Sequence, residues 1–130
     1  MIKKIRKSLE EWKKILPEEV FAITRGNQDE PPYDNAYWDN KKPGHYKCSN
    51  CKLTLFSSKH KYNAGTGWPS FWKPYRSEHV VYRIDSVGDK KEARCARCDA
   101  LLGHVFKDGP LPTRLRYCMN SAALTFEEQS

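Results

Sequence analysis

The stretch Lys91-Glu92-Ala93-Arg94-Cys95-Ala96-Arg97-Cys98 decides the fold, because it leads a predicted strand directly into a C-x-x-C pair. Upstream of it, Val80-Val81-Tyr82-Arg83-Ile84 is rich in β-branched and aromatic residues, and Gly88-Asp89 is a turn signal between the two runs. The two runs therefore predict a β-hairpin that carries two thiols at its end.

A second pair, Cys48-Ser49-Asn50-Cys51, precedes another short strand predicted at residues 52–56. Four thiolates around one ion form a tetrahedral zinc site that leaves no position open for water or substrate. The separation between Cys51 and Cys95 is well beyond the roughly 15–20 residues of a simple zinc ribbon. We therefore expect a structural zinc ion that ties two distant hairpins together. Its predicted ligands are Cys48, Cys51, Cys95 and Cys98.

Further strands are predicted at residues 101–106 and 122–126, with a turn-rich run at residues 107–112 between them. The glycine-bounded turn at residues 65–72 carries two Trp and one Phe, which suggests a pocket wall. Residues 24–47 show no period and indicate an ordered loop around the domain, although its aromatic residues could instead stack on bases. The predicted fold class is mainly β (α+β), a small antiparallel β-sheet or barrel-like domain with N-terminal helices.

The N-terminus has apolar residues at spacings of three and four, with lysines and arginines between them, which predicts an amphipathic helix over residues 1–16. Pro17 ends this helix, and Glu18 and Glu19 favour a second short helix after it. We expect residues 1–19 to pack on residues 20–127 within a single domain of residues 1–130. Attachment to a membrane surface or to a partner is the alternative for such a basic helix.

Composition restricts the classes of function that the chain can have. Its 130 residues are 38% hydrophobic and 12% aromatic, which is typical of a folded domain with a core. The formal net charge of +7 is moderate and gives little support to nucleic-acid binding. The sequence has neither an apolar run of ~18 residues nor a signal-peptide core, so we expect a cytoplasmic chain without a membrane segment. We also expect it to be a monomer.

Cys118 is the one cysteine of five that the two C-x-x-C pairs leave without a partner, and it is the candidate nucleophile. Arg116 before it and Asn120 after it could lower its pKa and orient what it attacks. A buried thiol that acts only as a small hydrophobe is the alternative. His104 lies in an apolar run and is either a core residue or, with Asp108 to orient it, a proton donor.

Four motifs in register resemble the B-type peptide-methionine (R)-S-oxide reductases. They are Gly65-Thr66-Gly67-Trp68-Pro69-Ser70-Phe71, Arg94-Cys95-Ala96-Arg97-Cys98-Asp99, Leu102-Gly103-His104-Val105-Phe106-Lys107-Asp108-Gly109-Pro110 and Leu115-Arg116-Tyr117-Cys118-Met119-Asn120-Ser121-Ala122. Glu30-Pro31-Pro32-Tyr33 resembles the N-terminal segment of the same family.

The resemblance implies a zinc-bound fold of antiparallel sheets in which Cys118 attacks the sulfoxide sulfur and becomes a sulfenic acid. It implies that Trp68 packs on the substrate methyl group, with Phe71 and Phe106 as further substrate-binding residues. It also implies that substrate positioning and proton transfer fall to His104, Asp108, Arg116 and Asn120. The expected substrate is methionine (R)-sulfoxide in oxidised proteins, and the expected reductant is thioredoxin or another thiol.

Two positions depart from the pattern of many family members. Leu101 stands where many members carry a second histidine, so His104 would have to act alone or through water. Thr66 stands where many members carry a resolving cysteine, so an external thiol must reduce Cys118. The rival hypotheses are a zinc-stabilised nucleic-acid binder and a structural interaction module, and in both of them Cys118 is dispensable.

Overall fold

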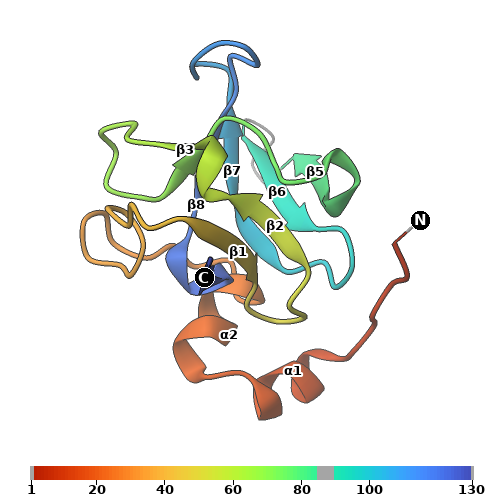
Figure 1. The fold of residues 1–130 in the computed structure, drawn as a ribbon. Helices are drawn as coiled ribbons and strands as arrows, with labels where there is room; N and C mark the ends of the chain where they lie inside the picture. Colours follow the sequence, from red (N-terminus) through yellow and green to blue (C-terminus); the bar gives the residue numbers. More distant parts are fainter. Residues whose placement is uncertain (1, 85–89, 130) are drawn as a thin grey trace.

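The computed structural model describes residues 2–84 and 90–129, so the turn predicted at Gly88-Asp89 lies outside the described residues. Two antiparallel sheets make up the fold (Figure 1). One sheet has three strands in the order β2-β1-β9, and the other has six in the order β3-β4-β8-β7-β6-β5. The predicted fold class is confirmed. The strands are β1 (Gly44–Cys48), β2 (Thr54–Ser57), β3 (Lys61–Tyr62), β4 (Ser70–Phe71), β5 (Val80–Ile84), β6 (Lys91–Cys95), β7 (Leu101–Phe106), β8 (Arg116–Met119) and β9 (Leu124–Glu128).

Aromatic side chains join the two sheets in one core. The rings of Phe56 in β2 and Phe71 in β4 are stacked with centroids 4.4 Å apart. Tyr46, at the centre of the three-stranded sheet, packs on Phe71 at 5.1 Å and on Phe126 at 4.9 Å. The two contacts of Phe71 cross from one sheet to the other, so the β1 and β4 faces are held together by side-chain packing rather than by backbone hydrogen bonds.

Alternation along β7 and β8 sends side chains to opposite faces of the six-stranded sheet. Val105 lies opposite Tyr117 in the pairing of these strands, and both side chains are buried in the core. The neighbours of Val105 and Tyr117 along each strand point to the opposite face and are only partly buried. These neighbours are His104, Phe106, Arg116 and Cys118. The sheet therefore has an inner face that forms the core and an outer face that is free to carry reactive groups.

Two short helices, α1 (Leu9–Ile15) and α2 (Glu18–Thr24), lie at one end of the sheets (Figure 1). The prediction of a helix over residues 1–16 is wrong at its start. Ser8 caps α1, since its side chain accepts from the Glu11 amide at 3.1 Å while the Glu11 carboxylate accepts from the Ser8 amide at 2.9 Å. Residues 2–7 are not helical, and Met1 lies outside the described residues.

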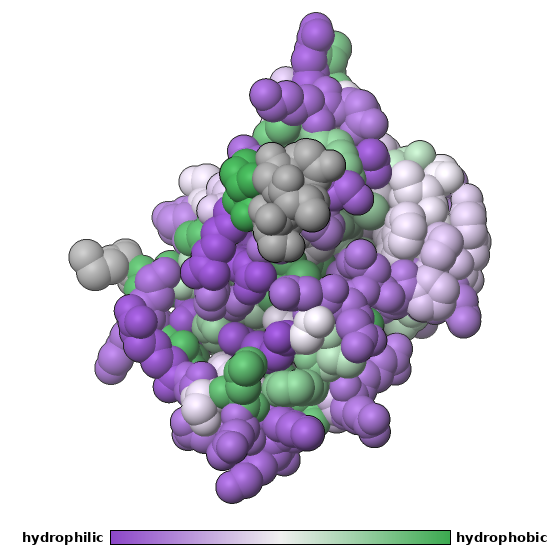
Figure 2. Space-filling view, turned by 180° about the vertical axis from the view of Figure 1, so that it is seen from behind, coloured by the Kyte–Doolittle hydropathy of each residue, from purple (hydrophilic) through white to green (hydrophobic). Residues whose placement is uncertain are grey.

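Trp12 fastens α1 to the domain. Its side chain is 2% exposed and belongs to the core cluster, and the Arg25 guanidinium lies 4.2 Å from its ring centroid. Leu16 and Ile5 of the predicted apolar face also pack against this cluster, whereas Leu9 of the same face is exposed. None of the described helices is long and apolar enough to cross a membrane. The surface seen from behind is mostly hydrophilic, with apolar residues in small groups (Figure 2).

Several strand predictions are confirmed and others are corrected. The strands at β5, β6 and β7 have the predicted positions. The loop predicted over residues 24–47 is wrong at its end, where β1 forms the central strand of a sheet. The last strand starts at Leu124, because Ser121–Ala123 forms a 3₁₀ turn before it. Strand β8 was not predicted at all.

Candidate functional site

The four cysteines of the C-x-x-C pairs form one cluster. Their Sγ atoms all lie within 4.8 Å of one another, with Cys48 and Cys98 3.6 Å apart and Cys51 and Cys95 3.5 Å apart. Tetrahedral zinc with bonds of ~2.3 Å to sulfur places its ligands about 3.8 Å apart, so the donor set fits this ion. Arg97 donates to Cys51 Sγ at 3.4 Å, which is the kind of contact that orients a metal ligand.

The backbone forms the same kind of turn at the two C-x-x-C pairs. The Lys52 amide donates to the Cys48 carbonyl at 2.8 Å, and the Asp99 amide donates to the Cys95 carbonyl at 2.9 Å. Lys52 and Asp99 both adopt positive φ, at 71° and 68°. Each turn therefore curls two thiols toward the same point. Since all four donors are thiols and three of them are buried, this cluster can hold a metal ion but offers no free position for substrate.

A cavity of about 300 Å³ opens beside Cys118 on the outer face of the six-stranded sheet. Six residues of the predicted site line it, namely Trp68, His104, Phe106, Arg116, Cys118 and Asn120. Asp29, Thr66, Lys90 and Met119 complete the lining. Most of the residues that line this cavity were therefore predicted from the sequence.

The pairing of β7 with β8 explains why these side chains meet. His104 lies directly opposite Cys118, and Phe106 lies directly opposite Arg116. Directly opposed residues in antiparallel strands share a face, with Cβ atoms about 4.5–5.5 Å apart. The Arg116 guanidinium accordingly lies 4.2 Å from the centroid of the Phe106 ring.

Asp108 lies at the rim and binds Arg116 rather than lining the cavity. Arg116 donates to its two carboxylate oxygens, from Nε at 2.8 Å and from a terminal nitrogen at 3.2 Å. This hydrogen bonding holds the pKa of Asp108 below its usual value. The sequence suggests that Asp108 could orient His104. In the described part of the chain its side-chain partner is Arg116, which it fixes over Phe106.

Two opposing influences set the pKa of Cys118. Burial raises the pKa of the thiol, and this effect exceeds the lowering by the Arg116 charge and by a hydrogen bond with Thr66. The Arg116 charge lowers the pKa of Cys118, as the sequence suggested, but the effect of burial is larger. In the absence of a ligand, the pocket therefore favours the neutral thiol over the thiolate.

Phe71 does not line this cavity. Its side chain is fully buried and stacks on Phe56, on the inner face of the sheet. It lies opposite Tyr117, while its neighbour Ser70 lies opposite Cys118. Period-two alternation therefore places Phe71 behind the sheet that carries the thiol.

Glu30 is a site residue that sequence reasoning missed. Its carboxylate accepts from the amides of Ser121 and Ala122, the latter at 3.1 Å. Its carbonyl accepts from Trp68 Nε1 at 2.9 Å, and its amide donates to Asn120 Oδ1 at 3.3 Å. Burial raises the pKa of this carboxyl, against the lowering by the two amides. The signal available in the sequence was the Glu30-Pro31-Pro32-Tyr33 motif.

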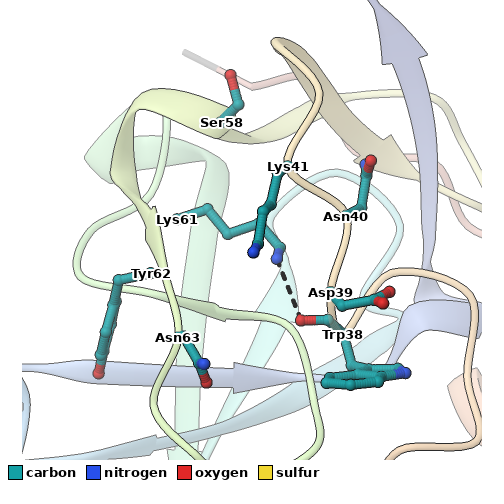
Figure 3. A pocket seen from close by; sticks show the side chains of 8 residues that line it. All are labelled: Trp38, Asp39, Asn40, Lys41, Ser58, Lys61, Tyr62 and Asn63. Carbon is teal, nitrogen blue, oxygen red and sulfur yellow. Dashed lines mark hydrogen bonds between the residues drawn. The ribbon is translucent and has the colours of Figure 1, made fainter.

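A larger cavity of about 390 Å³ lies next to β3 and is separate from the thiol (Figure 3). The ammonium groups of Lys41 and Lys61 point into it, and Lys61 donates to the Trp38 carbonyl at 3.3 Å. Neither Cys118 nor His104 belongs to its lining. Size alone therefore does not identify the reactive site.

Comparison with known families decides the assignment of the chain. The model of the SelR domain matches residues 16–128, which include the cysteine cluster and the whole Cys118 cavity. The chain belongs to the SelR-domain family. The resemblance to B-type methionine sulfoxide reductases is confirmed, and with it the class of the enzyme, an oxidoreductase.

Curated relatives of this SelR-domain chain carry the name peptide methionine sulfoxide reductase MsrB. One from Hahella chejuensis is 46% identical over 125 residues, covering 95% of this chain and 90% of the relative. One from Thioalkalivibrio sulfidiphilus is 48% identical over 120 residues, covering 91% and 88%. One from Escherichia coli O139:H28 is 48% identical over 123 residues, covering 93% and 90%.

The two departures of this SelR-domain chain occupy different surroundings. Thr66 lines the Cys118 cavity, so the residue at the resolving position still faces the thiol. Leu101 is 2% exposed at the start of β7, opposite Arg94, and it is absent from the lining of the cavity. His104 is thus the one histidine among the residues that line the cavity.

Proposed function

We propose that this chain reduces methionine (R)-sulfoxide to methionine, with Cys118 as the nucleophile. One observation carries the proposal. Cys118 is the one cysteine outside the four-cysteine cluster, and it lines a cavity with an aromatic wall, a histidine and an arginine. The family assignment and the names of the relatives support the same reaction.

The reaction moves one oxygen atom between two sulfur atoms. The Cys118 sulfur attacks the sulfoxide sulfur, the substrate S–O bond breaks, and the oxygen remains on Cys118 as a sulfenic acid. The substrate sulfur gains the electron pair that the Cys118 sulfur loses. Arg116 favours the attacking thiolate, and His104 protonates the oxygen as its bond to the substrate sulfur breaks. Asp108 fixes Arg116.

Shape provides the selection for one epimer. Trp68 and Phe106 offer aromatic surface for the methyl group, while Asn120 and Arg116 offer hydrogen-bond donors to the oxygen in the same cavity. Exchanging methyl and oxygen on the sulfoxide sulfur would place the oxygen against a ring. Glu30 is hydrogen-bonded to both Trp68 and Asn120, so it positions an aromatic group and a hydrogen-bonding group of the pocket relative to each other. We propose Phe71 as a support of this pocket from within the core.

Zinc is the metal that we propose for Cys48, Cys51, Cys95 and Cys98. When bound, zinc would supply structural binding energy there rather than catalysis, because the four thiols fill its coordination sphere. The four thiols are then committed to the metal. An external thiol, such as thioredoxin or a small thiol, must therefore reduce the sulfenic acid on Cys118 through a mixed disulfide.

We propose oxidised proteins as the substrate pool and a cytoplasmic monomer as the working form. The thiol chemistry requires a compartment that supplies reductant. The small apolar groups on the visible surface support a monomer (Figure 2). Within it, we propose that the N-terminal segment of residues 1–19, which contains the helix Leu9–Ile15, packs on the catalytic domain of residues 20–127.

The decisive experiment compares the separated R and S epimers of methionine sulfoxide, with a dithiol reductant and with wild-type and Cys118→Ser protein. We expect turnover of the R epimer by the wild type alone. Without reductant, mass spectrometry should find one added oxygen or a sulfenic-specific adduct at Cys118, with the metal retained. Turnover by Cys118→Ser would contradict the role of Cys118 as the nucleophile. Salt-dependent binding of oligonucleotides without any turnover would favour a nucleic-acid binder.

A further inference from the structure

The cavity next to β3 contains two lysines from different parts of the chain (Figure 3). Its volume of about 390 Å³ exceeds that of the Cys118 cavity. Lys61 belongs to β3, whereas Lys41 belongs to the loop that precedes β1. Lys41 is exposed and Lys61 is half-buried, and both ammonium groups point into this lysine cavity. A ligand that enters from solvent can therefore meet both groups.

No carboxylate pairs with these two charges in the described part of the chain, where the ion pairs all involve other residues. Asp39 also lines the cavity, but its carboxylate points away from both ammonium groups (Figure 3). Burial lowers the pKa of Lys61 and the Lys41 charge adds to this effect, while the Asp39 charge opposes it. An anion in the cavity would therefore relieve the cost of holding two cations there.

The walls of the lysine cavity are joined to the glycine turn of the reactive site. Asn63, in the lining, accepts at Oδ1 from the Gly65 amide at 2.9 Å. Trp38, also in the lining, packs edge-on against Tyr33 with ring centroids 5.0 Å apart. Tyr33 donates from its amide to the Gly67 carbonyl at 2.8 Å. The two cavities are thus neighbours on either side of one turn.

The two cavities are close enough for one peptide to occupy both. Asn63 lines the lysine cavity, and Thr66 lines the Cys118 cavity. A chain extends by at most ~3.6 Å per residue, so the Cα atoms of these two residues lie within about 11 Å of each other. An extended peptide rises about 3.3 Å per residue and covers this distance in roughly three or four residues.

We propose that the lysine cavity binds the carboxylate of an acidic residue in the oxidised protein, about three to five positions from the methionine sulfoxide that reacts with Cys118. Lys41 and Lys61 donate to this carboxylate from two sides. This inference rests on the proposed reduction of methionine sulfoxide, and it names the protein segments that the enzyme prefers. A lysine that points inward from an edge strand can also prevent unwanted strand pairing, but that role does not require Lys41 in its loop.

The test uses three peptides that each contain one methionine (R)-sulfoxide. One has Glu roughly four positions before it, one has Glu roughly four positions after it, and the third has Gln in both places. We expect one acidic peptide to have a KM ~5-fold below that of the Gln peptide at low salt, with little change in kcat. High salt should reduce this difference, because it screens the charges.

The variant is Lys41→Gln combined with Lys61→Gln, which should give all three peptides the same KM. The matched control is Lys13→Gln combined with Lys14→Gln, which removes the same charge from exposed positions in α1 and should retain the preference. Lys61 also donates to the Trp38 carbonyl, so Lys41→Gln alone is a second variant that leaves this contact intact. It should reduce the preference to ~2-fold.

Wild-type KM values within twofold of one another for all three peptides would overturn the proposal. A preference that survives in the double lysine-cavity variant would also overturn it. Equal loss of the preference in the α1 control would show only a general attraction to a basic protein, which contradicts a specific site. Failure of the proposed function is distinct from these results, since the wild type would then turn over none of the three peptides.

Discussion

Cys118 is buried enough that its own pocket opposes its ionisation, and Arg116 is the cation that counteracts this. We expect the rate of alkylation of Cys118 by iodoacetamide to rise with pH, with a midpoint above that of a cysteine in an unstructured peptide. Arg116→Gln should move the midpoint higher still, because it removes the cation and leaves the Asp108 charge unpaired. Mass spectrometry of the Cys118 peptide gives the midpoint.

Arg114→Gln is the matched control, since Arg114 is exposed and is not among the charges that shift the Cys118 pKa. A midpoint below that of the free peptide would contradict the prediction.

The raised pKa of Cys118 also affects the stability of the folded state. Because the folded pKa is raised, the thiol destabilises the folded state as pH rises above the unfolded pKa, where the unfolded chain loses its proton more readily.

His104 is the second residue for which we make a prediction, since it is the one histidine in the lining of the Cys118 cavity. His104→Ala should lower the single-turnover rate by the ~10²–10⁴-fold typical of a lost general acid. His45→Ala, in the other sheet, should leave the rate unchanged. Single-turnover kinetics at saturating sulfoxide make the comparison. A loss below about threefold for His104→Ala would assign the proton to water or to another group.

The sequence predicts those parts of the site in which the type and spacing of the residues indicate their chemistry. Cys118 stood out because counting left it without a partner, and the four other cysteines stood out by their spacing. Glu30 could not be predicted in this way, since it acts through backbone amides ninety-odd positions away that only the fold brings near. The role of Phe71 was overestimated because one position of alternation separates a pocket residue from a core residue.

At the scale of elements, the strands that carry clear β patterns were predictable, and β8 was not. Its sequence Arg116-Tyr117-Cys118-Met119 alternates between partly buried and buried positions, but the strand has only four residues. So short a run gives little periodicity to detect. Strand β1 was hidden for a similar reason, because it follows Pro43 within a segment of turn residues.

The close pairing of β7 and β8 depends on a glycine. A Cβ atom at Gly103 would lie 2.1 Å from the Cys118 carbonyl oxygen and 2.8 Å from the Met119 Cα. We expect Gly103→Ala to push the strands apart, to lower stability by ~1–3 kcal/mol and to reduce activity by displacing Cys118 from His104. Urea unfolding and R-epimer turnover measure the two effects.

Gly65→Ala is a useful comparison, because its Cβ would meet no atom within 4 Å while its φ of +74° still strains an alanine. It should cost stability through the backbone alone, without moving the thiol. Full activity in Gly103→Ala would show that β7 and β8 can separate without harm to the site.

At the scale of the whole molecule, the cysteine cluster joins the end of β1 in one sheet to the end of β6 in the other. We expect Cys51→Ser to lower metal content and the thermal midpoint together, because the binding free energy of a structural ion is also folding free energy. Elemental analysis and thermal unfolding measure them. Ser49→Ala, within the same turn, should retain the metal. Purified protein without metal and with unchanged stability would refute the structural role.

The N-terminal segment lies against the turn that carries Cys95 and Cys98. The Ile5 amide donates to the Arg97 carbonyl at 2.7 Å, and the Lys4 ammonium donates to the Ala96 carbonyl at 2.7 Å. The shape of that turn thus determines how well the Ile5 amide is protected from exchange with solvent, although Ile5 is far from the turn in sequence. In a hydrogen-exchange experiment, slow exchange at Ile5 should be lost on chelation of the metal, and this one amide would then report the state of the thiol cluster without touching any of its ligands.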